Sequence, residues 1–384
     1  MQFSLTEEQR IIQETARALT KRDIEPVLAA HDPNRPLPKQ ALRQVFGALH
    51  SLGLMAPRVP AEEGGGGLSY LDYGLIMEEL PASIGGAVVA HEAAVTRIYQ
   101  AADAAQRKRF LPGLLDGSQI ACSGISEPNV GSDPRAIETR ARREGDFVVI
   151  DGTKLWITNG SISDLIVVVA ALQDASGGGG ITRIVVQREP SPYQAHEVQT
   201  IGLCQGHLSE VIFVACRVPA ENILGAPGDA HQALTLTWLA NRPLFGLMAV
   251  GLARRALDAC IAYVGVRKQF GKRIGGFQLV QEMLSEIATR IDASRLLCLR
   301  ALSMLDEGVR SNKEAAMAKW FATENCLAAL NLAMQVHGAN GLTREVGLER
   351  LYRDARMLTI PDGTTQIQHL IIGKELTGIS AYTG

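Results

Sequence analysis

The sequence predicts an α+β fold in three parts: an N-terminal α-helical domain, a middle antiparallel β domain and a C-terminal domain resembling a four-helix bundle. Two changes of pattern predict this order. Helical spacing of apolar residues gives way near Gln119 to short β-branched runs, and the helical spacing returns after Gly225. The expected domains are therefore residues 1–118, 119–225 and 226–384. A chain of 384 residues is long enough for more than one core.

The first domain is predicted from a helix start and a proline-rich break. Thr6 precedes two glutamates, and apolar residues then recur at helical spacing through position 19. Prolines between positions 33 and 38 separate this helix from a second one expected around residues 41–52. Four glycines at 64–67 are not followed by Lys-Ser/Thr, so they indicate a tight turn and not a phosphate-binding loop.

The second domain is predicted from four short strands at residues 147–150, 165–169, 181–186 and 211–214. Asp151-Gly152, Asn159-Gly160 and the glycine run at 177–180 are typical of the tight turns that join antiparallel strands. Because no long helix separates the strands, we expect a compact antiparallel sheet and not a dinucleotide-binding βαβ unit.

The third domain is predicted from a long apolar stripe. Leu279, Met283, Ile287 and Ile291 recur every four residues, and residues 297, 301 and 305 extend the series. Such a stripe is core packing, and its length indicates a helix bundle.

Composition excludes several classes of function. The formal net charge of −2 gives no basic field for nucleic acid or anionic membranes. Apolar runs fall short of the roughly 18–20 residues that a membrane span needs, and the acidic N-terminus does not resemble a secretion signal. The six cysteines are widely spaced, which predicts reduced core residues, a cytoplasmic location and no metal site.

Five motifs carry the functional prediction. In chain order they are GISEPNVGSD at 124–133, WITNG at 156–160, RKQFGK at 267–272, QVHGANG at 335–341 and DGTTQIQ at 362–368. In this order and spacing they resemble the signatures of acyl-CoA dehydrogenases over essentially the whole chain. The resemblance implies bound FAD, oxidation of an acyl thioester, and electron transfer to an electron-transfer flavoprotein.

One set of residues is expected at the flavin ring. The resemblance places backbone N–H groups of Ile125 and Ser126 at the pyrimidine edge of the flavin and adds Ser132 to the cofactor contacts. Trp156 would offer an apolar face to the ring system, and Thr158 a hydroxyl near N5. Taken alone, Trp156 and Thr158 fit a strand-core aromatic and a turn residue better, and the surrounding motifs reverse that preference.

A second set is expected at the dinucleotide part of FAD. Its members are Arg267, Phe270, Gln278, Gln335, Gly338 and Ala339. A pyrophosphate suits arginine donors and close backbone approach at glycine. The resemblance implies that Arg267 acts from one subunit and the Gln335–Gly338 loop from its neighbour, so the protein would be at least a dimer and by resemblance a homotetramer.

The catalytic base is expected at Asp362, with Arg242 beside it. The resemblance identifies two sites for the base, and the other one is Asn241, which cannot take a proton. Thr364 and Gln366 resemble loop residues that contact the cofactor. The alternative for Asp362 is a turn residue, because Pro-Asp-Gly is a common turn sequence.

Two departures widen the choice of substrate. Asp362 replaces the usual Glu, and residues 203–210 lack the usual Arg-containing loop, with His207 more typical of a structural residue. A dehydrogenase of a hydroxyacyl or aminoacyl group on an acyl-carrier protein is therefore one alternative, and a flavin oxidase or monooxygenase of the same fold is another. The sequence does not predict the acyl group.

Overall fold

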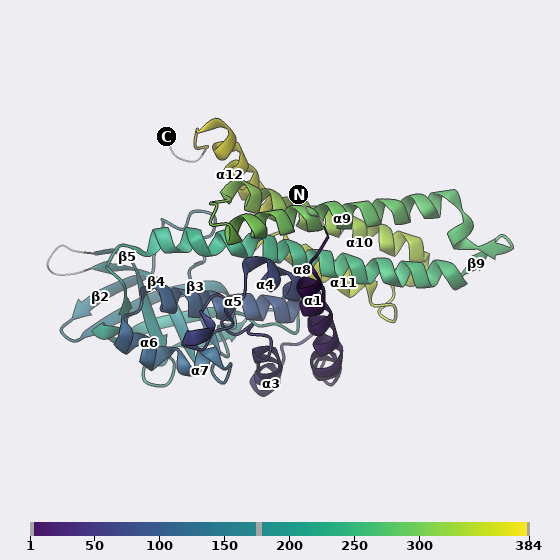
Figure 1. Cartoon of the computed structure of the whole chain (residues 1–384). Coiled ribbons are helices and arrows are strands. Elements are labelled where there is room, and N and C mark those ends of the chain that lie inside the picture. The colour runs from purple at the N-terminus through teal and green to yellow at the C-terminus, as the bar shows by residue number, and fades with distance from the viewer. Residues whose placement is uncertain (1–3, 174–178, 382–384) are drawn as a thin grey trace.

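The computed structural model describes residues 4–173 and 179–381, with only the backbone of residues 231–236. Residues 177 and 178 of the predicted glycine turn lie outside this part. The sheet lies at one end of a long helix bundle, and the N-terminal helices lie beside the sheet and along the adjoining part of the bundle (Figure 1). The N-terminal helices are α1 (Glu7–Leu19), which continues through a π-helical turn (Thr20–Ile24), α2 (Glu25–Ala29), α3 (Lys39–His50), α4 (Tyr70–Glu79), α5 (Ala82–Ala101), α6 (Ala104–Phe110) and α7 (Pro112–Leu115).

The predicted helix start at Thr6 is confirmed. The Thr6 hydroxyl accepts a hydrogen bond from the Gln9 amide at 3.2 Å, and the Gln9 side chain accepts one from the Thr6 amide at 3.0 Å. This reciprocal cap satisfies two N–H groups that the first turn of a helix leaves without partners.

The sheet is mixed, so the prediction of a wholly antiparallel domain is wrong in two pairings. Its strands are β1 (Ala121–Gly124), β2 (Arg140–Glu144), β3 (Phe147–Thr158), β4 (Leu165–Gln173), β5 (Gly179–Gln187), β6 (Gln194–Glu197), β7 (Leu208–Pro219) and β8 (Ile223–Leu224). Their order is β6-β7-β3-β2-β4-β5-β8, with β1 beside β4. Strands β1 and β2 both run parallel to β4, and the other pairings are antiparallel.

The predicted turn at Asp151-Gly152 is also wrong, because both residues lie inside strand β3. A register shift against β7 falls between Ile150 and Gly152. At this bulge the Asp151 carboxylate accepts the Ala215 amide N–H at 2.6 Å. The side chain thus binds the neighbouring strand instead of closing a turn.

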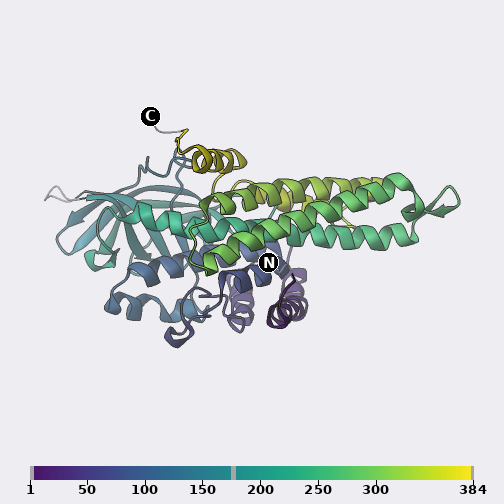
Figure 2. The ribbon, with the colours of Figure 1, turned by 45° about the horizontal axis from the view of Figure 1, so that its top comes forward.

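The bundle consists of long helices that extend away from the sheet. They are α8 (Ala230–Val266), α9 (Gln278–Asp306) and α10 (Asn312–His337), followed by the shorter α11 (Leu348–Leu358) and α12 (Thr365–Thr377). Helix α8 begins beside the sheet and reaches the far end of the bundle (Figures 1 and 2), a length of roughly 55 Å at 1.5 Å per residue. None of the described helices combines the length and apolar character of a membrane span.

The predicted apolar stripe on α9 is confirmed in its middle. Ile287, Ile291 and Ala301 are buried, but Leu279 is 72% exposed where the helix begins at the far end of the bundle. A short hairpin of β9 (Lys268–Gln269) and β10 (Lys272–Arg273) joins α8 to α9 there.

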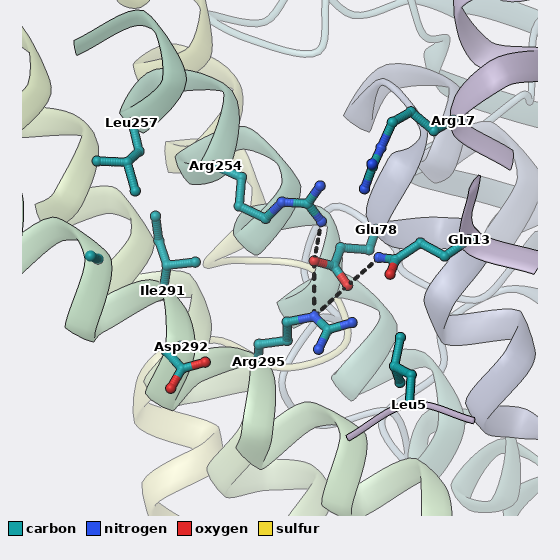
Figure 3. A pocket seen from close by; sticks show the side chains of 10 residues that line it. Leu5, Gln13, Arg17, Glu78, Arg254, Leu257, Ile291, Asp292 and Arg295 are labelled. Atoms are coloured by element: carbon teal, nitrogen blue, oxygen red, sulfur yellow. Dashed lines mark hydrogen bonds and ion pairs between the residues drawn. The ribbon is translucent and has the colours of Figure 1, made fainter. Parts of the chain in front are cut away.

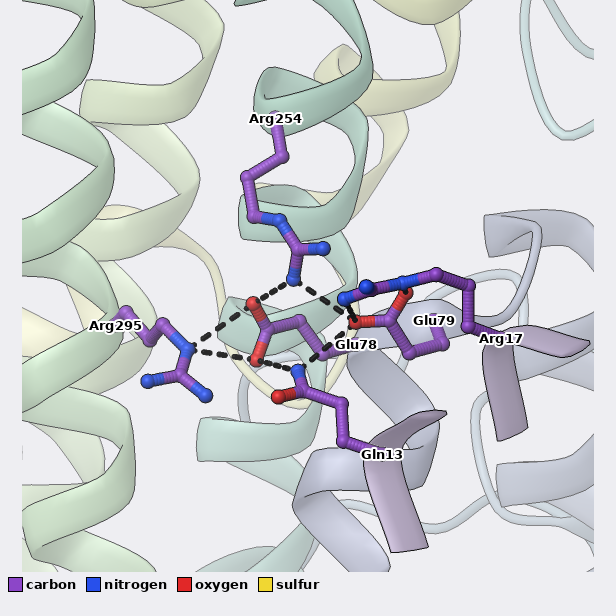
Figure 4. A network of polar contacts seen from close by, with 6 residues as sticks. All are labelled: Gln13, Arg17, Glu78, Glu79, Arg254 and Arg295. Carbon is purple, nitrogen blue, oxygen red and sulfur yellow. Dashed lines mark hydrogen bonds and ion pairs between the residues drawn. The ribbon is translucent and has the colours of Figure 1, made fainter. Parts of the chain in front are cut away.

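A buried charge cluster joins the N-terminal helices to the bundle. Arg254 of α8 contacts Glu78 and lies 3.0 Å from Glu79, both at the end of α4, and Arg295 of α9 lies 2.8 Å from Glu78 (Figure 4). Arg17 of α1 completes the cluster 3.0 Å from Glu79. Beside it lies a cavity of about 440 Å³ between α1, α8 and α9 (Figure 3). Since these arginines all pair with the two glutamates, the cluster holds four helices together.

Candidate flavin and acyl site

The loop after β1 is held by a buried glutamate. Glu127 is 3% exposed and accepts hydrogen bonds from Lys154 Nζ at 2.6 Å, the Glu138 amide at 2.6 Å and the Thr139 amide at 2.9 Å. Burial alone would raise the pKa of Glu127, but these donors outweigh it and lower that pKa. The Ser126 carbonyl also accepts the Leu155 amide at 2.9 Å, so the loop is fixed against β3.

The polar and aromatic side chains that we expect to contact the flavin ring are available for such contacts. Trp156 lies in β3 at a register shift against β7, with φ of +65°, a conformation that a bulky residue rarely adopts, and it is 55% exposed. Within the described part of the chain, the hydroxyls of Ser126 and Thr158 have no hydrogen-bond partner. Ser132 is exposed in the same loop as Ser126. These residues fit an aromatic ring system with polar edges.

Asp362 lies in the loop between α11 and α12, in a left-handed conformation with φ of +52°. Its carbonyl accepts hydrogen bonds from Arg242 Nε at 3.4 Å and Gln368 Nε2 at 3.1 Å. The next carbonyl, of Gly363, accepts Lys319 Nζ at 2.7 Å and Gln368 Nε2 at 2.8 Å. The Asp362 Oδ2 atom is buried, and no hydrogen-bond partner for it exists among the described residues. Hydrogen bonds therefore fix the backbone of this loop, while Oδ2 of the Asp362 carboxylate remains available to accept a hydrogen bond or a proton.

Buried cations surround this carboxylate. Arg242 is 6% exposed, Arg97 of α5 is 3% exposed and Lys319 of α10 is fully buried. Burial lowers the pKa of Lys319 to about 7, although attraction to Asp362 acts in the opposite direction. Arg97 Nη1 also donates to Ser123 Oγ at 2.6 Å, on the strand that leads into the flavin-side loop. The loop that carries Asp362 and the loop after β1 therefore lie close together.

Three residues of this site were not predicted from the sequence: Arg97, Lys319 and Gln368. For Arg97 and Lys319 the available signal was a cation with small apolar residues three and four positions before it in its helix, which places a charge on a face that tends to be buried. Two further predicted residues follow Asp362, and their predicted contacts to the cofactor stay predictions. The Thr364 hydroxyl caps α12 by accepting the Ile367 amide at 3.4 Å, and Gln366 is exposed in the first turn of that helix.

The second predicted set lies at the opposite end of the bundle. Arg267 follows the last residue of α8, and its amide bonds to the Tyr263 carbonyl at 2.9 Å. The Tyr263 ring stacks on His337 at 4.4 Å, next to Gly338, whose φ is +59°. Figure 1 shows the β9 hairpin of this end far from the sheet. Arg267 therefore lies with the Gln335–Gly338 loop, and the prediction that these two act from different subunits on one cofactor does not fit this arrangement.

His207 occupies a structural position, as expected. It is 5% exposed, with Nδ1 at 2.5 Å from a Glu197 carboxylate oxygen and Nε2 at 2.8 Å from the Leu37 carbonyl. Both ring nitrogens bind protein groups, so the side chain connects the N-terminal helices to the sheet.

Comparison with known proteins identifies the family. Residues 6–118, 122–221 and 233–377 match the N-terminal, middle and C-terminal domains of acyl-CoA dehydrogenases. A probable acyl-CoA dehydrogenase of Bacillus subtilis, YngJ, is 34% identical over 387 residues, covering 98% of this chain and all of the relative. The chain belongs to the acyl-CoA dehydrogenase family, whose members are flavoprotein oxidoreductases.

Solved structures agree with this assignment. Butyryl-CoA dehydrogenase of Megasphaera elsdenii superimposes with a TM-score of 0.90 at 28% identity, covering 98% of this chain and 100% of that one. The prolyl acyl carrier protein oxidase AnaB superimposes with a TM-score of 0.88 at 26% identity, covering 97% of this chain and 100% of that one.

Proposed function

We propose that this protein catalyses FAD-dependent α,β-dehydrogenation of an acyl-CoA, with Asp362 as the general base. The observation that carries the proposal is the Asp362 loop, in which Arg242, Lys319 and Gln368 fix the backbone while Oδ2 is buried with no hydrogen-bond partner among the described residues. A carboxylate held in this way is suited to take a proton from carbon.

In this proposal, different residues of the chain have different roles in the reaction. Asp362 would remove the proton from the α-carbon, and the guanidinium of Arg242 would hold the backbone of that residue in place. Bound FAD would accept the β-hydrogen together with two electrons, which then pass to an acceptor flavoprotein. Trp156, Ser126 and Thr158 would bind and orient the ring system, since their aromatic and hydroxyl groups are open on one part of β3 and the adjoining loop.

An Asp362→Asn substitution tests the base. It keeps the size of the side chain and the contacts of the backbone, so FAD content should equal that of the parent. The rate of flavin bleaching by acyl-CoA under anaerobic conditions should fall by at least about a hundredfold, at the lower end of what general-base catalysis contributes. Bleaching at the parental rate would make Asp362 a turn residue. Isolation of a protein that cannot be reconstituted with FAD would remove the whole proposal.

The likeness to a carrier-protein oxidase and the shortened base support a second candidate, oxidation of an acyl group on an acyl-carrier protein. An aspartate is shorter than a glutamate by one C–C bond, about 1.5 Å, and a misplacement of about 1 Å can cost a hundredfold in rate. Presenting one acyl group on CoA and on a carrier protein distinguishes the two candidates by which thioester bleaches the flavin faster.

The cofactor site is proposed to be completed by a second copy of the chain. The flavin-ring residues lie in β3 and the loop after β1, whereas Arg267 precedes β9, which Figure 1 shows at the end of the bundle away from the sheet. Large apolar side chains are exposed at that end, including Phe270 at 94%, Leu279 at 72% and Leu342 at 71%. An exposed apolar patch of this kind marks an interaction surface. Assembly into at least a dimer, and by resemblance to the family into a homotetramer, would account for both observations.

A further inference from the structure

Lys154 is a buried cation that donates to the loop expected at the flavin ring. The lysine lies in β3 and is fully buried. Its Nζ donates hydrogen bonds to the Ile125 carbonyl at 3.1 Å and to the Glu127 carboxylate at 2.6 Å. Glu127 supplies the counter-ion that a buried ammonium requires, so the bond to the Ile125 carbonyl is an additional contact of this charge.

The Ile125 carbonyl and the Ser126 N–H belong to one peptide group. In a planar trans peptide these two bonds point in opposite directions, so a carbonyl directed at Lys154 directs the N–H away from it. The following carbonyl, of Ser126, accepts the Leu155 amide at 2.9 Å, which fixes the next peptide as well. Among the described residues, the Ser126 N–H has no hydrogen-bond partner. This backbone donor is therefore available to an acceptor on a ligand.

The flavin ring would supply that acceptor through its pyrimidine edge. The contact to Leu155 places Ser126 next to the strand position before Trp156, whose side chain is exposed. Reduction adds negative charge to this edge of a flavin, and preorganised donors favour the state that carries the charge. Hydrogen bonds in a chain strengthen one another, by roughly 10–30% per bond, and a charged donor forms a stronger bond than a neutral one. An ammonium on the carbonyl thus makes the N–H of the same peptide a better donor.

We propose that Lys154 raises the reduction potential of the bound flavin by polarising the peptide between Ile125 and Ser126. This rests on the proposed function, in which Ser126 and Trp156 hold the ring system. Lys154 would touch neither the flavin nor the substrate, so it is a positioning residue that acts through the peptide. Its ion pair with Glu127 has no net charge, so the effect on the flavin passes mainly through the hydrogen-bonded peptide.

A double substitution, Lys154→Met with Glu127→Gln, tests the proposal without leaving a buried charge unpaired. The new glutamine can still accept the amides of Glu138 and Thr139, which Glu127 accepts in the parent. The midpoint potential of the FAD-loaded protein is measured anaerobically with xanthine and xanthine oxidase against a reference dye. Reduced FAD should bind about three- to tenfold more weakly relative to oxidised FAD, which lowers the two-electron potential by about 15–30 mV. The Kd for oxidised FAD should stay within about threefold of the parental value.

Lys39→Met with Asp164→Asn is the matched control. This pair also joins a lysine to a carboxylate at 2.6 Å, and Asp164 also accepts a backbone amide, that of Ile120 at 2.8 Å. The control pair lies at the start of β1, whereas Lys154 contacts the loop that follows the end of that strand. The control variant should therefore keep the parental potential.

The pH dependence of the potential gives a second test. Burial lowers the pKa of Lys154 to about 8, although Glu127 acts in the opposite direction. As the lysine becomes neutral above this pH, the parent should lose about 15–30 mV beyond the slope of the flavin itself, and the double variant should not. Lys154→Arg keeps its proton, so it should have the parental potential at neutral pH and show no additional fall. Lys319, whose pKa is about 7, is present in all of these proteins, so its effect cancels.

Several results would overturn the proposal. A double variant that binds FAD at the parental potential would show that Lys154 only holds the loop, and an equal shift in the control would show that the effect does not depend on this peptide. If the double variant does not retain FAD, an additional fall in Lys154→Arg equal to that of the parent would contradict the role of the lysine. A parental potential that follows the flavin slope alone would do so without any variant. A parent protein that cannot be reconstituted with FAD would remove the proposed function as well, whereas the other results leave it in place.

Discussion

Lys319 is expected to position the base, and Lys319→Met tests this. The lysine is fully buried and donates to the carbonyls of Thr359 at 3.1 Å and Gly363 at 2.7 Å, which flank Asp362. The loop holds Asp362 in a left-handed conformation, which costs roughly 1–2 kcal/mol and needs such anchors. The methionine variant keeps the apolar volume and loses the donor.

The magnitude follows from the lost hydrogen bonds. The Gly363 carbonyl would still accept Gln368 Nε2 at 2.8 Å, so below pH 7, where Lys319 is protonated, the net loss is close to one charge-assisted bond, about 1.5–3 kcal/mol. If that energy holds the loop in its active conformation, the rate of flavin reduction should fall about 10- to 150-fold, since about 1.4 kcal/mol corresponds to a factor of ten.

Stopped-flow measurement of flavin reduction under anaerobic conditions gives the rate, and FAD content and Tm report whether the site is intact. A positioning role predicts a lower rate of reduction with little change in the substrate dissociation constant and in FAD content. Lys374→Met, on the exposed surface of α12, is the matched control and should behave as the parent. A Lys319→Met enzyme within threefold of the parental rate would refute the reasoning.

Two other predictions concern stability and assembly. His91 is buried and neutral in the fold, because its Nδ1 accepts the Ala121 amide at 3.0 Å, and burial lowers its pKa from 6.5 to about 4. The unfolded chain therefore binds more protons between these values, and the free energy of unfolding should fall by about 1.6 kcal/mol from pH 6.5 to pH 5. Chemical denaturation at both pH values should show a smaller loss in His91→Gln than in the exposed control His196→Gln, and equal losses would contradict the assignment. Arg267→Ala should weaken FAD retention by about 1.5–3 kcal/mol in a protein that light scattering shows to be an oligomer, whereas a competent FAD-saturated monomer would contradict the shared site.

The sequence was sufficient for features that depend on local spacing. Thr6 caps its helix as predicted, the four predicted strands exist, and the family motifs gave the fold. The sequence was insufficient where contacts to residues distant in the chain determine the local structure. Asp151-Gly152 has the composition of a turn, but a contact to Ala215 on another strand keeps it in β3. Parallel pairing of β1 and β2 with β4 leaves no periodic signal, since both kinds of strand alternate alike.

The sequence predicted the site residues that belong to a family motif, but it did not predict those that lie outside the motifs. Asp362 and Arg242 lie in adjoining loop and helix as expected, with the Arg242 side chain bound to the Asp362 carbonyl. Arg97 and Lys319 carry no motif, because their roles depend on α5 and α10 meeting the base loop from separate parts of the chain. A cation on the apolar face of a helix indicates that the side chain is buried, but it does not indicate which residues it contacts.

The separation between the flavin-ring residues and the Arg267 end has a consequence for handling the protein. If each cofactor is enclosed by two copies, association of subunits and binding of FAD are linked by mass action, and each strengthens the other. The apparent affinity for FAD then depends on protein concentration, and the yellow colour should fade on dilution in buffer without FAD, even though no residue has changed. Excess FAD should in turn keep dilute protein assembled, because in the proposed arrangement the dinucleotide would contact Trp156 of one copy and Arg267 of another.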